Sequence, residues 1–201
     1  MSPPGSPGKN YSLNSSNLSL KAYFLVNLSK FIVEMIGTAV LGIFWLMIGD
    51  QQVGLLLGYW VLTLFGEAIS GAHYNPAITL VFMLRKNSKT FGSRRLKGLF
   101  YIVAQMLGGL IAALVSKFLL AGAGEKMNIA PNPFRKADLS YRATPSMISE
   151  VVGSFVFIFL CMLCSDKKTQ YSQDKVINCF IMSSAYISAR LIAGGCFVTH
   201  L

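Results

Sequence analysis

The chain has 201 residues, of which 53% are hydrophobic and only 13% are charged. Soluble domains carry about 25% charged residues, so this deficit excludes an ordinary soluble domain and favours an integral membrane protein. The net charge of +10 would suggest nucleic-acid binding in a soluble protein. In a membrane protein, basic residues in the loops set the orientation instead, and we expect no nucleic-acid partner.

The first 28 residues are polar and rich in Ser, Asn and Pro, which predicts a disordered tail. The remainder, residues 29–201, is expected to form one all-α membrane domain. A span needs about 20 apolar residues, and a short apolar piece, Pro76–Leu84, cannot cross. Five runs can, and we expect spans at about Phe31–Ile48, Val53–Ile69, Leu99–Leu120, Met147–Cys164 and Val176–Phe197.

The distribution of Lys and Arg predicts the topology, because basic loops stay on the cytoplasmic side. With five spans, the tail, the segment before the third span and the loop after the fourth span share one side. These segments carry twelve basic residues, whereas the opposite side carries five. We therefore expect a cytoplasmic N-terminus, in a membrane that the sequence does not identify.

Two polar cassettes open the first and fourth spans, at Glu34–Thr38 and Glu150–Ser154. In each, an acid is followed at i+3 by Gly and at i+4 by a small hydroxyl residue, so the three share one helix face. This recurrence favours an internal repeat over chance, with a first repeat at about residues 29–120 and a partial second at about 146–201. On this evidence each glutamate could simply hold two helices together.

The segment after the second span turns small and polar before Pro76–Leu84 begins. An Asn at the N-cap and a Pro at the first helical position are typical of a helix start. We therefore expect a re-entrant loop and half helix, with Asn75 and the positive end of the helix dipole inside the membrane. A surface turn followed by an amphipathic helix is the alternative.

The stretch Ser70–Thr79, which reads Ser-Gly-Ala-His-Tyr-Asn-Pro-Ala-Ile-Thr, closely resembles the signature of the aquaporin, or major intrinsic protein, family. The two glutamate cassettes and Tyr101–Gln105 resemble the family's first, fourth and third helices. The resemblance covers about residues 30–201. It implies a right-handed bundle of inverted repeats, which here has five transmembrane helices and one re-entrant half helix, and a homotetramer with one pore per subunit.

The resemblance also implies roles for individual residues. Asn75, Pro76 and Ala77 would form the pore motif, with Asn75 donating to passing water. The carbonyls of Gly71, Ala72 and His73 would form a polar rail beside it. The side chains that would brace the loops inside the bundle are Glu34, Glu150 and Gln105.

The chain departs from the family because it contains one Asn-Pro-Ala and not two. Matching Gly71–Tyr74 to Val198–Leu201 predicts that the second motif would begin directly after Leu201. The second half helix, the sixth span and the family's filter arginine are then missing. The other filter positions fall near Leu55, Arg190 and Thr199, although a gap of one residue would move Arg190 onto the helix flank.

The resemblance implies passive, single-file passage of water, or of a small neutral solute such as glycerol, with no cofactor and no metal. The alternative is a naturally truncated, non-conducting subunit that joins full-length channels or has no function. An enzyme is not expected, because His73 and His200 are the only histidines and no nucleophile or metal cluster is placed to work with them.

Overall fold

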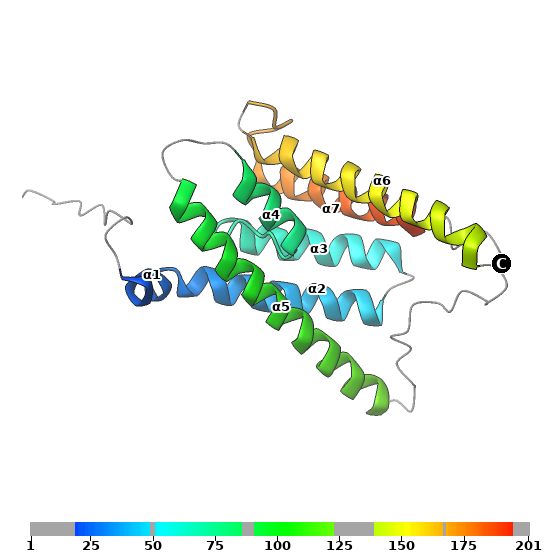
Figure 1. Cartoon of the computed structure of the whole chain (residues 1–201), viewed down its shortest axis with the longest axis horizontal. Coiled ribbons are helices and arrows are strands. Elements are labelled where there is room, and N and C mark those ends of the chain that lie inside the picture. Colours follow the sequence, from blue (N-terminus) through cyan, green and yellow to red (C-terminus); the bar gives the residue numbers. More distant parts are fainter. Residues whose placement is uncertain (1–18, 49–50, 86–90, 123–138, 167, 195–201) are drawn as a thin grey trace, which may run out of the picture.

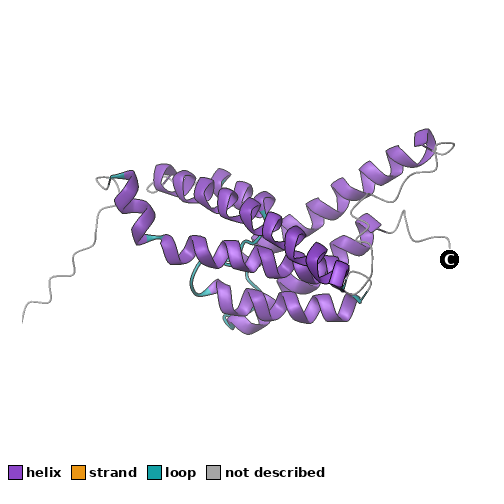
Figure 2. Cartoon of the chain, turned by 90° about the horizontal axis from the view of Figure 1, so that it is seen from below, coloured by secondary structure: helices purple, strands orange, loops and turns teal. Residues whose placement is uncertain are grey.

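The computed structural model describes residues 19–48, 51–85, 91–122, 139–166 and 168–194. Within these ranges the chain forms helices and short loops without a strand (Figure 2), which confirms the expected all-α class. The helices are α1 (Leu20–Val26), α2 (Leu28–Met47), α3 (Gln52–Glu67), α4 (Pro76–Leu84), α5 (Phe91–Gly122), α6 (Leu139–Ser165) and α7 (Lys175–Gly194).

The five expected spans coincide with α2, α3, α5, α6 and α7, but only three of these helices are suited to cross a membrane alone. Those segments are Leu28–Met47, Gly92–Gly122 and Met147–Ser165. With 16 residues, α3 is only about 24 Å long, shorter than a hydrocarbon core of about 30 Å. The 20-residue helix α7 is less apolar because it carries Lys175, Arg190 and several polar residues.

The helices pack in two connected layers (Figure 1). Helix α5 crosses α2 obliquely, and α6 runs beside α7. Between these pairs, α3 contacts both α2 and α7, while α4 packs mainly on α5. The short helix α4 and the loop before it are therefore held from several sides.

Small residues allow α2 and α5 to approach closely. A Cβ atom at Gly42 would lie 2.6 Å from the Cβ of Ala112. One at Gly108 would collide with the carbonyl oxygen of Met35. Small residues at such crossings bring helix backbones together and strengthen their van der Waals contact.

Part of the segment expected to be a disordered tail is ordered, because residues 20–26 form helix α1. Its N-cap is Ser19, whose hydroxyl accepts a hydrogen bond of 3.3 Å from the Ala22 amide. Tyr23 is buried and donates to the Ser93 carbonyl at 3.1 Å. Phe24 stacks on Phe31 with ring centroids 5.4 Å apart. This aromatic packing outweighs the polar composition of the surrounding sequence.

Two ion pairs hold the ends of α4 and α3 against neighbouring helices. Arg85, the C-cap of the half helix α4, forms an ion pair with Asp166 directly after α6. The end of α3 is tied to the start of α7, because Lys175 Nζ lies 2.8 Å from Glu67 Oε2. Arg85 and Asp166 thereby fix α4 against the end of α6.

Candidate functional site

The loop between α3 and α4 has an unusual backbone. Gly71, Ala72 and Tyr74 all have positive φ, at 98°, 48° and 46°. Glycine adopts this region easily, whereas Ala and Tyr do so at a cost. Such strained residues cluster at functional sites and persist only where surrounding contacts enforce them.

Glu34 supplies those contacts from α2. Its side chain is fully buried. One carboxylate oxygen accepts from the Ser70 hydroxyl at 2.6 Å and the His73 amide at 3.0 Å. The other accepts from the Tyr74 amide and from Gln105 Nε2, both at 2.8 Å. Four donors therefore satisfy a carboxylate whose burial would otherwise be very costly.

A second set of hydrogen bonds joins the loop to α4 and α5. The Gln105 amide on α5 contacts the Thr79 hydroxyl at 2.9 Å, and that hydroxyl lies 3.1 Å from the Asn75 carbonyl. His73 Nδ1 also lies 3.1 Å from the same hydroxyl, and its ring stacks on Phe82. The Tyr101 hydroxyl donates to the Ser70 carbonyl at 2.6 Å.

Tyr74 is the member of the site that sequence reasoning missed. Its ring fills the space between α2 and α3, where a Cβ atom at Gly37 or at Gly66 would overlap it. Its hydroxyl donates to the Leu62 carbonyl at 3.1 Å. The glycine of the first cassette could have indicated this contact, because it marks where a bulky group approaches the α2 backbone.

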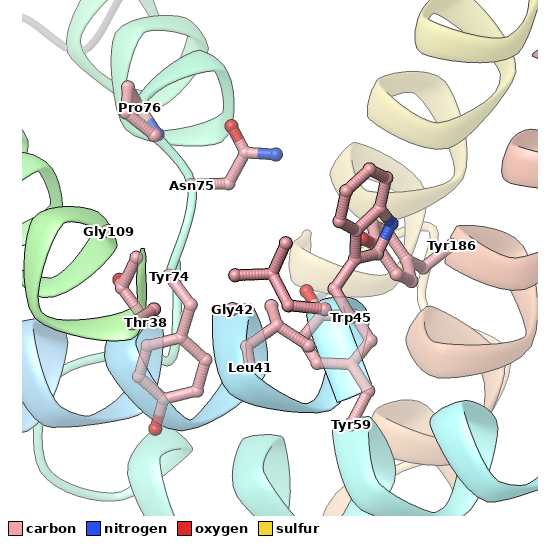
Figure 3. A pocket seen from close by; sticks show the side chains of 12 residues that line it. Thr38, Leu41, Gly42, Trp45, Tyr59, Tyr74, Asn75, Pro76, Gly109 and Tyr186 are labelled. Atoms are coloured by element: carbon pink, nitrogen blue, oxygen red, sulfur yellow. The ribbon is translucent and has the colours of Figure 1, made fainter. Parts of the chain in front are cut away.

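The oxygen and the nitrogen of the Asn75 side-chain amide face different surroundings. Its Oδ1 accepts from the Ala77 amide at 2.8 Å and caps α4, while Pro76 begins the helix. Figure 3 shows the amide nitrogen pointing away from that cap, into a neighbouring pocket. The predicted cap and half helix, Pro76–Leu84, are therefore present with the expected bounds.

The pocket encloses about 850 Å³, its open side included. Asn75 and Thr38 supply amide and hydroxyl groups to a lining that is otherwise mainly aromatic and aliphatic (Figure 3). The lining residues come from five helices and from the loop before α4: Thr38, Leu41, Gly42, Trp45, Leu46, Tyr59, Tyr74, Asn75, Pro76, Gly109, Ala112 and Tyr186.

A cation stands next to this pocket. The Arg190 guanidinium lies over the Trp45 ring, 5.3 Å from its centroid, and donates to Gln52 Oε1 at 3.2 Å. Trp45 is part of the pocket wall, as is Tyr186, which lies one turn before Arg190 on α7. Arg190 is half-buried and contacts the pocket wall through Trp45.

Within the described part of the chain, the other residues that the sequence predicts for the site do not line the pocket. Leu55 is fully buried in the core against Tyr59 and does not line the pocket. The backbone of residues 71–73 lies in the braced loop but outside the pocket lining. Glu150 is exposed on α6. Thr199 lies outside the described residues.

Comparison with known proteins decides the family. The sequence profile described as "Major intrinsic protein" matches residues 48–198, which is more than half of the chain. The chain belongs to the major intrinsic protein family. Together with the apolar helices, membership makes it an aquaporin-type integral membrane protein.

Curated relatives of the major intrinsic protein family include plant aquaporins. The chain is 33% identical over 128 residues to Aquaporin PIP1-1 of Oryza sativa subsp. japonica. It is 35% identical over 128 residues to Aquaporin PIP1-5 of Zea mays. Each match covers 60% of this chain and 40% of the relative, so the matched part spans less than half the length of these aquaporins.

Proposed function

We propose that this chain forms a passive channel for water in which the solute passes the Asn75 amide. The observation that supports this most directly is that the oxygen and the nitrogen of the Asn75 amide point to different places. Its oxygen is engaged in capping α4, so its nitrogen remains to donate into the pocket (Figure 3). A polar donor in a mainly apolar wall binds water briefly without holding it.

The electrostatics of α4 support selection against cations. The positive end of its dipole lies at Asn75 and Pro76, and its first turn contains no acidic residue. A helix N-terminus directed at the passage raises the energy of any cation, hydrated protons included. In this proposal the carbonyls of Gly71, Ala72 and His73 continue the polar path along the loop.

Glu34 and Gln105 would serve the channel by holding the loop in its strained form. Their hydrogen bonds reach Ser70, His73, Tyr74 and Thr79 but leave the Asn75 side chain to the pocket. Bracing of this kind fixes a donor within a fraction of an ångström. The corresponding role predicted for Glu150 is not part of this bracing, because its side chain is exposed on α6.

Arg190 is the proposed selectivity residue, with Leu55 and Thr199 as the other filter positions. The contact between the Arg190 guanidinium and the Trp45 ring, which we call the clamp, places a fixed positive charge beside one wall of the pocket. Leu55 would act only through its packing against Tyr59. Because Leu41 and the aromatic rings make the wall apolar, a small solute with a carbon backbone, such as glycerol, is the second candidate.

Assembly and orientation are part of the proposal. Large apolar side chains on α5 and α6 are exposed, among them Met106, Phe118 and Phe155, and they require lipid or another subunit as cover. A homotetramer would cover some of them. The excess of basic residues on one side supports a cytoplasmic N-terminus.

The experiment that tests the proposal is the substitution Asn75→Asp in reconstituted vesicles. Asp keeps an oxygen that can cap α4, because both residues are good N-caps, but it removes the donor and adds a negative charge. We expect the osmotic water permeability to fall at least tenfold with little change in melting temperature. Gln173→Glu makes the same amide-to-acid change at an exposed position between α6 and α7 and should leave flow unchanged. Equal flow in both variants and the parent would refute the role of Asn75.

A further inference from the structure

Five basic residues lie on α1, at the start of α2 and at the start of α5, the segments that meet at the Tyr23–Ser93 and Phe24–Phe100 contacts. We name this surface the basic rim, and its members are Lys21, Lys30, Arg94, Arg95 and Lys97. The hydrogen bond from Tyr23 to the Ser93 carbonyl joins α1 to α5 at this point. Lys30 directly precedes Phe31, whose ring meets the Tyr101 ring at 5.9 Å, and Lys97 lies over that same Tyr101 ring, so both lysines belong to this part of the surface.

The local charge balance is strongly positive. Helix α5 contains no acidic residue, and its N-terminus adds the positive end of a helix dipole to three basic side chains. Glu34 lies one turn below Lys30, but its two oxygens already accept four hydrogen bonds from the loop and Gln105. Lys97 rests on the Tyr101 ring, 4.7 Å from its centroid, and that contact leaves its charge in place.

Apolar side chains flank the basic rim on its outer side. Leu20, Leu25 and Val26 of α1 are 61%, 57% and 58% exposed. Phe24 instead turns inward onto Phe31, and Tyr23 is buried and bonded to the Ser93 carbonyl. Exposed apolar groups beside lysines are typical of a segment at a membrane surface, where the apolar groups reach the acyl boundary and the cations meet the head groups. A free phosphate or an acidic soluble protein would leave Leu20, Leu25 and Val26 in water.

We propose that the basic rim binds the head groups of anionic phospholipids, with α1 lying in the membrane interface and Lys30 and Lys97 contacting the lipid phosphate. Such a site would anchor the face of the bundle that carries α1 and the start of α5 on an anionic leaflet. Lipid phosphate would also offset the positive charge of the two lysines and of the α5 N-terminus. The inference does not depend on conduction by the pocket.

The test is lipid retention by the purified full chain, measured by native mass spectrometry with phosphatidylglycerol against phosphatidylcholine. We expect preferential retention of phosphatidylglycerol. Lys30→Gln and Lys97→Gln should each weaken that preference roughly fivefold, since one Lys near an anionic surface contributes about that factor. Lys30→Arg and Lys97→Arg should retain it. The matched control is Lys117→Gln, an exposed residue near the other end of α5, which should have no effect.

Three results would overturn the proposal. The parent chain could retain both lipids equally, the Gln variants could keep the full preference, or Lys117→Gln could weaken it as much as Lys97→Gln does. The source of the phosphate is separated by a competition arm. If inorganic phosphate displaces phosphatidylglycerol and Leu25→Ser leaves its retention unchanged, the basic rim is a simple anion site and not a lipid surface. Far-ultraviolet circular dichroism on each variant excludes unfolding as the cause.

Discussion

The Gln105 amide donates to the Glu34 carboxylate across 2.8 Å, and both side chains are fully buried. The same amide nitrogen lies 2.9 Å from the Thr79 hydroxyl. One side chain of α5 thereby links α2, which carries the acid, to α4, which carries the half-helix cap. The position of Asn75 thus depends on groups that never reach the pocket.

Glu34→Gln is expected to destabilise the protein. An amide offers one oxygen in place of two, so two of the four buried donors lose their acceptor. The free energy of unfolding should fall by about 2–4 kcal/mol for two unsatisfied buried groups. Denaturation followed by circular dichroism in detergent measures the loss, and water permeability should fall with it as the loop loosens.

Glu150→Gln is the matched control, because the same cassette surrounds it on α6. Its side chain is exposed, and exposed substitutions usually change stability by less than about 0.5 kcal/mol. Equal losses for the two variants would mean that Glu34 stabilises the helices generally and does not brace the loop.

Gly37→Ala should also destabilise the protein, because the new methyl group would overlap the Tyr74 ring. Overpacking of this kind costs about 1–3 kcal/mol. Combining Gly37→Ala with Tyr74→Ala should recover part of that loss, which a double-mutant cycle detects as a coupling energy.

The control for Gly37→Ala is Gly109→Ala on α5, where the added methyl group would meet no neighbour within 4 Å. There the higher helix propensity of alanine should raise stability by up to about 1 kcal/mol. A loss at Gly109 equal to that at Gly37 would contradict the assigned contact with Tyr74.

Much of the fold could be predicted because apolar runs are a strong local signal. The half helix was predicted with the bounds that the structure gives, Pro76–Leu84, since a cap and a helix-initiating proline mark its start. Helix α1 could not be predicted, because seven residues form a helix here only through the packing of Tyr23 and Phe24. That packing involves Phe100, far away in the sequence.

The site was predictable in its residue types and not in its geometry. Two similar cassettes predict the same role for Glu34 and Glu150, yet one is buried under a loop and the other is exposed. Of the two glutamates, only Glu34 contacts the loop of residues 68–75 within the described residues. The positive φ of Tyr74 and its place between two glycines depend on three segments at once, which no local pattern contains.

Thr79→Val tests the second set of hydrogen bonds with almost no change of shape. Valine removes the hydroxyl that meets Gln105, His73 and the Asn75 carbonyl. The free energy of unfolding should fall by about 1–3 kcal/mol, because a buried polar group loses its partner. Thr169→Val, in the exposed connection after α6, serves as the control. No loss at Thr79 would show that the network is not needed to hold α4.

Arg190→His is expected to raise the osmotic water permeability, because it removes a fixed cation held against the pocket wall by Trp45 and Gln52. Arg190→Lys keeps the charge and can still lie over an indole face, an interaction of about 0.5–2 kcal/mol, so it should behave like the parent. Stopped-flow swelling of reconstituted vesicles measures both.

A fluorescence measurement separates the clamp from its effect on flow. In a Trp60→Phe background, Trp45 is the only tryptophan, and Arg190→His should change its emission and its quenching by acrylamide, while Arg190→Lys should not. If the emission changes but the permeability does not, the clamp exists and Arg190 lies outside the solute path. If neither changes, the contact between Arg190 and Trp45 is absent in solution. If both change together, Arg190 controls the pocket through the Trp45 ring.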